Sequence, residues 1–115
     1  MPRNIDYADS GEAYGLKWYV VEHPTMGHFC GYVLLPSTHS DFRKTYDDID
    51  ADVHGGLTYA NEEAGMWCVG FDCAHVGDFM PTFSLDTGPR HEWTLKEVVR
   101  ECKQLAKQLN ERHLR

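Results

Sequence analysis

The stretch Trp93-Thr94-Leu95-Lys96-Glu97-Val98 decides the fold, because it carries the signal for the start of a helix. Thr94 is a favoured N-cap residue, and Glu97 stands three positions later, as in a capping box flanked by apolar residues. The apolar positions that follow recur at offsets of three and four; they are Leu95, Val98, Val99, Cys102, Leu105, Ala106 and Leu109. We therefore predict an amphipathic helix that begins at Thr94, ends near Asn110 and packs on a flat apolar surface.

That surface is predicted to be a small antiparallel sheet of about four strands, which makes the fold class α+β. The segments before the helix are short, rich in aromatic and β-branched residues, and separated by turn-forming residues. The predicted strands are 16–21, 29–35, 57–60 and 66–72, with a hairpin turn over 61–65. Strand alternation in the last of them puts Trp67, Val69 and Phe71 on one face and Asp72 on the other.

The chain length sets the number of domains. A chain of 115 residues with 42% apolar content suits one hydrophobic core, so we predict a single domain over 1–115. Residues 1–13 are predicted to be a flexible N-terminal segment. Residues 38–53 contain five aspartates and few apolar anchors, which favours an acidic loop or lid with room for one helical turn.

The charge and the cysteines exclude several classes of partner. A net charge of −7 repels DNA, RNA and anionic bilayers, although a small anionic ligand can still be held by local donors. The four cysteines form no Cys-x-x-Cys pair, and the first ten residues are too polar for a secretory signal. We therefore expect a reduced, cytoplasmic protein that binds neither a membrane nor polymeric nucleic acid.

Two glycine-containing stretches, 54–59 (His-Gly-Gly-Leu-Thr-Tyr) and 70–78 (Gly-Phe-Asp-Cys-Ala-His-Val-Gly-Asp), concentrate the reactive side chains. Each lies where a predicted strand begins or ends, and glycine backbone there lets polar groups converge. The alternative is structural, because a histidine before Gly-Gly can simply cap a turn and a strand tyrosine is usually half in the core. The site interpretation depends on the two stretches occurring together.

Histidine changes its charge near neutral pH, so His54 and His75 can form a general acid and base pair suited to phosphodiester cleavage. Thr58, Tyr59 and Asp72 complete the predicted catalytic set, since a hairpin brings one of the two hydroxyls to the face that carries the carboxylate. Four further residues are predicted to contact a ligand, two of them by stacking on a base: His39, Tyr32, Trp67 and Asp78.

A metal centre is the alternative chemistry for the same stretches. They contain ligand types used by zinc or manganese, namely His54, Asp72, Cys73, His75 and Asp78. The tight Cys73-Ala74-His75 spacing, with no second paired-ligand unit, does not fit a closed structural zinc site. We therefore predict no metal or other cofactor and keep a catalytic divalent metal as the alternative.

A succession of short motifs carries a family resemblance. In order they are Cys30-Gly31-Tyr32-Val33, 36–39, the acidic run, 54–59, 67–75 and Gly77-Asp78. From about Gly27 to the C-terminal helix, this succession resembles a family of small, functionally unassigned proteins encoded by bacteriophages and prophages. The resemblance implies a phage accessory protein in the cytoplasm of the bacterial host, and it implies no particular reaction.

Three functions from different classes fit these observations. The first is a counter-defence protein that binds and hydrolyses a nucleotide immune second messenger, such as a cyclic dinucleotide, as a phosphodiesterase. The second is a sponge that sequesters the same nucleotide without cutting it. The third is an acidic inhibitor of a host protein, which uses the loop aspartates to occupy a basic groove. A sheet covered by one helix also leaves a face for a second copy, so a homodimer is a further expectation.

Overall fold

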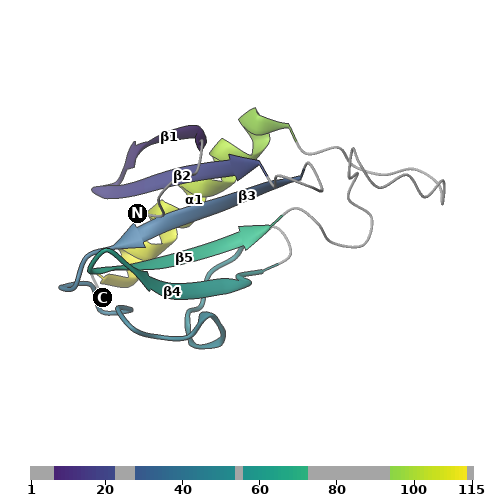
Figure 1. Ribbon diagram of the computed structural model, residues 1–115. Helices are drawn as coiled ribbons and strands as arrows, with labels where there is room; N and C mark the ends of the chain where they lie inside the picture. The colour runs from purple at the N-terminus through teal and green to yellow at the C-terminus, as the bar shows by residue number, and fades with distance from the viewer. Residues whose placement is uncertain (1–6, 23–27, 54–55, 73–93, 114–115) are drawn as a thin grey trace.

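The computed structural model describes residues 7–22, 28–53, 56–72 and 94–113, which form one antiparallel sheet and one long helix (Figure 1). The elements are β1 (Tyr7–Ala13), β2 (Leu16–Glu22), β3 (Phe29–Leu35), β4 (Tyr59–Glu63), β5 (Met66–Asp72) and α1 (Leu95–His113). The strand order within this described part is β1-β2-β3-β5-β4. The predicted α+β architecture, a sheet packed against a C-terminal helix, is thus confirmed.

The structure adds one strand to the predicted sheet of about four and corrects the flexible segment expected over 1–13, of which residues 1–6 lie outside the described residues. Residues 7–13 instead form β1, an edge strand paired antiparallel with β2, so the described sheet has five strands. The turn between them uses Tyr14 and Gly15, both with positive φ (52° and 76°). Two such residues match the right-handed twist of a hairpin, and this turn is the signal that the sequence analysis missed.

The hairpin of β4 and β5 begins and ends differently from its prediction. The strand expected over 57–60 begins at Tyr59 and continues to Glu63, so the turn shrinks to Ala64 and Gly65. These residues have φ of 52° and 81°, the same pattern as the first hairpin. The strands expected over 29–35 and 66–72 match β3 and β5 residue for residue.

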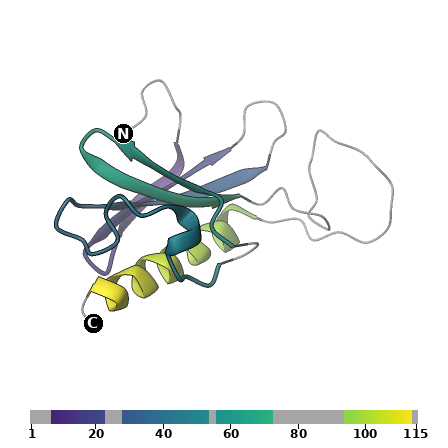
Figure 2. The same cartoon turned by 90° about the horizontal axis from the view of Figure 1, so that it is seen from below.

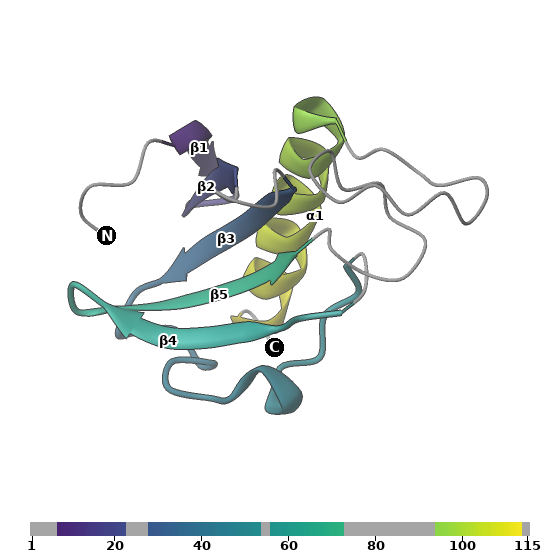
Figure 3. The same cartoon turned by 45° about the vertical axis from the view of Figure 1, so that its right-hand side comes forward.

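The helix lies across one face of the sheet (Figures 2 and 3). Its apolar stripe joins the inward side chains of β2, β3 and β5 in one core; the fully buried members include Val20, Val33, Val69, Phe71, Val98, Cys102, Leu105 and Leu109. Gly31 of β3 permits this close approach, because a Cβ there would stand 2.6 Å from Cys102 Sγ and 2.6 Å from Phe71 Cζ. The predicted periodicity of the helix therefore identified its buried face.

The start of α1 has the predicted capping box. The Glu97 N–H donates to Thr94 Oγ1 (3.2 Å), and the Thr94 N–H donates to Glu97 Oε1 (3.1 Å). Replacing Thr94 by alanine should lower the free energy of unfolding by about 1 kcal/mol, because an orphan N–H loses its acceptor. Urea unfolding of this variant beside Thr38→Ala, at an exposed loop threonine, measures the effect; equal losses would contradict the capping role.

The opposite face of the sheet has its own smaller apolar cluster. Tyr19, Leu34 and Cys68 are buried there, with Tyr32 and Tyr59 packed against them. The two edge strands are more polar than this interior: Asp9 and Glu12 of β1 and Asn61 and Glu62 of β4 are exposed.

Among the described residues, no helix is long and apolar enough to cross a membrane.

The acidic segment 38–53 runs beside α1 and contains the expected helical turn, the 3-10 helix η1 (Tyr46–Asp48). It is anchored to the core, because Ile49 and Val53 are buried. Near its end, the Asp52 backbone exchanges two hydrogen bonds with the Gln108 side-chain amide of α1 (2.6 and 2.8 Å). This segment is therefore packed on the helix in the described conformation and is not an open lid.

Candidate functional site

Two polar residues predicted for the site meet at the end of the sheet. The Thr58 N–H donates to the Gly70 carbonyl (2.9 Å), which places residue 58 directly beside β5. The Thr58 hydroxyl then reaches the Asp72 carboxylate, with 3.4 Å between Oγ1 and Oδ2. Thr58 is exposed and Asp72 is half-buried, so this long hydrogen bond joins two groups at the surface.

Three tyrosines lie on the face opposite the helix, in a row that crosses β5 two residues before Asp72. Register places Tyr19, Tyr32, Gly70 and Tyr59 in one row across β2, β3, β5 and β4. The rings of Tyr19 and Tyr32 stack with centroids 4.9 Å apart, and Tyr59 meets Tyr32 edge-on at 5.6 Å. Gly70 makes room for this row, because a Cβ at that position would collide with the Tyr32 ring.

Cys30 is a member of this region that the sequence analysis missed. It is the register partner of Asp72 across β3 and β5. Burial, reinforced by the Asp72 charge, raises the pKa of the Cys30 thiol to about 11. Alternation does put residues 30 and 32 on one face, but the pairing with Asp72 required a register that the sequence does not reveal.

The tyrosine hydroxyls act as hydrogen-bonding groups at neutral pH. Burial raises the pKa of Tyr32, and the neighbouring Cys30 thiol adds to this shift. Burial also raises the pKa of Tyr59, while the neighbouring Asn61 side chain works in the opposite direction. Protonated phenols and a protonated thiol beside a carboxylate favour recognition of a ligand more than proton transfer.

Two of the predicted ligand-contacting residues lie elsewhere. Trp67 is on the helix side of the sheet, where its Nε1–H donates to the Lys44 carbonyl (2.8 Å) and its ring meets Phe42 edge-on. Because Tyr32 is on the opposite face, the two rings cannot stack on one small ligand. His39 is only 5% exposed, and both its ring nitrogens have hydrogen bonds within the protein. Both side chains therefore have structural roles in the described conformation.

The remaining predicted site residues, His54, His75 and Asp78, lie outside the described residues. Their approach to Thr58 and Asp72 stays a prediction. Within the described ranges, no group of three or more histidine, cysteine or acidic side chains could hold a metal ion. The metal alternative rests chiefly on residues of 73–78 and on His54, so it also stays untested.

No family model, no curated protein and no solved structure matches this chain. The resemblance to phage-encoded proteins consequently stays a prediction.

Proposed function

We propose that this protein is a phage accessory protein that binds a nucleotide second messenger, such as a cyclic dinucleotide, and hydrolyses it in the cytoplasm of the bacterial host. The observation that supports this proposal best is the contact between Thr58 and Asp72 beside Tyr59 at one end of the sheet. A hydroxyl, a carboxylate and an aromatic edge are together suited to the sugar and base of a nucleotide.

The chemistry of this pair indicates which part of the ligand it would contact. A carboxylate accepts hydrogen bonds from ribose hydroxyls or from base N–H groups, whereas it repels a phosphate. Tyr59 is half-buried, and stacking of a base on an exposed aromatic surface contributes about 1–3 kcal/mol. In this proposal the nucleoside end therefore lies at Thr58 and Asp72, and the phosphodiester lies nearer His54 and His75.

The hydrolytic step would use the two histidines as a pair. One imidazole takes a proton from the attacking water as its oxygen bonds to phosphorus, and the other gives a proton to the departing ribose oxygen as the phosphorus–oxygen bond breaks. A protein that only sequesters the nucleotide needs no such pair. The two versions differ in whether the ligand survives.

The binding claim predicts a specific loss in the variant Asp72→Asn. Calorimetry with a panel of linear and cyclic mono- and dinucleotides should detect a ligand, and this substitution should weaken its binding about tenfold or more, since a charge-assisted hydrogen bond is lost. Asp47→Asn, at an exposed carboxylate of the acidic segment, removes the same charge and should leave binding unchanged. Absence of binding across the panel, or equal weakening by both variants, would contradict the proposal.

Hydrolysis is separated from sequestration by the fate of the bound nucleotide. Chromatography after incubation should show a cleaved product for the wild-type protein and intact ligand for His54→Ala, which should retain much of its affinity. Full recovery of intact nucleotide from wild-type protein after heating would favour the sponge.

An acidic inhibitor of a host protein is the second candidate, and one observation favours it. Four aspartates of the acidic segment are exposed; they are Asp47, Asp48, Asp50 and Asp52. Asp41, by contrast, is buried in ion pairs with Arg112 and Lys44 and is not available to a partner. Host proteins captured on the wild-type chain but not on a variant with these four residues changed to asparagine would support this candidate.

A further inference from the structure

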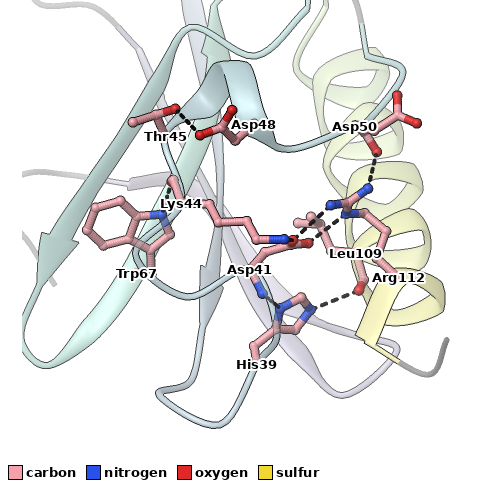
Figure 4. A network of polar contacts seen from close by, with 9 residues as sticks. All are labelled: His39, Asp41, Lys44, Thr45, Asp48, Asp50, Trp67, Leu109 and Arg112. Atoms are coloured by element: carbon pink, nitrogen blue, oxygen red, sulfur yellow. Dashed lines mark hydrogen bonds and ion pairs between the residues drawn. The ribbon is translucent and has the colours of Figure 1, made fainter.

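His39 joins the beginning of the acidic segment to the last turns of α1 (Figure 4). Its Nε2 lies 2.8 Å from the Leu109 carbonyl oxygen, and its Nδ1 accepts a hydrogen bond from the Asp41 N–H at 2.9 Å. The ring is 5% exposed. The contact with Leu109 links parts of the chain that are 70 residues apart.

The two hydrogen bonds fix the protonation state of the ring. The Asp41 N–H can only donate, so Nδ1 must have a free lone pair, and the Leu109 carbonyl can only accept, so Nε2 must have the proton. The imidazole in this conformation is therefore neutral. Adding a second proton would set an Nδ1–H against the Asp41 N–H and break that hydrogen bond.

Among the described residues, the charged side chains gathered at Asp41, next to His39, come from α1 and from the acidic segment. Arg112 of α1 donates to both carboxylate oxygens of Asp41 (2.6 and 2.8 Å), and Lys44 lies 3.0 Å from the same carboxylate. These bonds hold the pKa of Asp41 at about 2, so its charge persists in mild acid. Because lysine and arginine residues also stay cationic there, the imidazole is the group of this cluster whose type titrates between pH 5 and 7.

We propose that His39 is an acid-sensitive latch: its neutral ring helps to hold residues 39–48 against the end of α1, and protonation of the ring weakens this attachment although the Asp41–Arg112 ion pair persists. The folded latch accepts only the neutral ring, whereas the released segment accepts either form. Acid therefore shifts the equilibrium toward release. The Asp52–Gln108 hydrogen bonds and the buried Val53 keep the end of the segment attached.

Hydrogen exchange followed by mass spectrometry tests the latch without any ligand. Between pH 7.5 and 5.5, after correction for intrinsic rates, peptides from 39–48 of the wild-type protein should exchange about tenfold faster or more, as expected when a buried hydrogen bond is lost. Peptides from 66–72 serve as the internal reference and should not change. In His39→Gln, whose amide offers an acceptor and a donor but does not titrate in this range, the response should disappear.

An equal pH response in wild-type protein and His39→Gln, or no response in the wild type, would overturn the latch. If His39→Gln does not fold, nitrogen NMR of the wild-type ring decides the question. The neutral ring protonated at Nε2 should be seen at pH 7.5, and its conversion to the charged form should coincide with the loss of protection in 39–48. A ring already charged at pH 7.5 would refute the proposal. None of these readouts depends on nucleotide binding.

Discussion

Replacing Arg112 by methionine should lower the free energy of unfolding by about 3 kcal/mol, because the buried Asp41 carboxylate loses its bidentate partner. Asp41 is 1% exposed, and in the variant only Lys44 would remain beside its carboxylate. Methionine keeps most of the aliphatic length of arginine, so the loss should report mainly on the charge. Guanidinium unfolding measures it, and Arg100→Met, at an exposed position of the same helix, is the matched control.

The same pair gives wild-type stability a defined dependence on acid. The hydrogen bonds from Arg112 lower the pKa of Asp41 to about 2, below the value of about 3.9 for aspartate in an unfolded chain. A lowered folded-state pKa adds stability above pH 4 that is lost as the pH falls from about 4 to 2. The decrease in the free energy of unfolding on acidification should be smaller in Arg112→Met than in Arg100→Met. Identical stabilities and acid profiles for the two variants would contradict the role given to the ion pair.

Replacing Gly31 by alanine should destabilise the protein by about 2 kcal/mol, because the added methyl group overpacks the contact between helix and sheet. The new Cβ would lie 2.6 Å from Cys102 Sγ and 2.6 Å from Phe71 Cζ, so α1 or β5 must shift. At an uncrowded strand position, alanine would instead be favoured over glycine. The sign of the change therefore reports on the packing at this position.

A double-mutant cycle with Cys102→Ala tests this explanation. Removing the sulfur relieves one of the two collisions, so Gly31→Ala should cost less in the Cys102→Ala background than in the wild type. Some cost should remain, since the Phe71 ring is still present. Thermal unfolding of the four proteins gives the coupling energy. A Gly31→Ala variant as stable as the wild type, or costs that simply add, would show that this glycine does not set the helix position.

Local sequence signals predicted the parts of the fold that depend on neighbouring residues. The Thr94–Glu97 capping box and the strands 29–35 and 66–72 belong to this class. The strand at 7–13 does not, because its residues Asp9, Ser10 and Gly11 have low strand propensity and are held by pairing with β2. Tertiary pairing there outweighs local preference.

In the candidate site, too, local sequence predicts some contacts and gives no sign of others. Thr58 directly precedes β4 and Asp72 ends β5, the two strands of one hairpin, so their proximity followed from the sequence. Cys30 reaches the site through pairing of β3 with β5, strands that are not consecutive. The burial of His39 depends on a helix 70 residues away, and a polar sequence around it gives no sign of that contact. The pairing of distant strands and the packing of the helix on a distant segment cannot be predicted from a single sequence.

The acidic outer strands have a consequence for self-association. An edge strand has unpaired backbone donors and acceptors, so a second copy of the protein can pair with it and extend the sheet. Charged side chains on the edge strand oppose this pairing. Asp9 and Glu12 on one border and Glu62 on the other would bring like charges together in any such ribbon of molecules. Growth of fibres by strand addition is therefore disfavoured. The expected homodimer would have to form through a face of the protein and not through its edge strands.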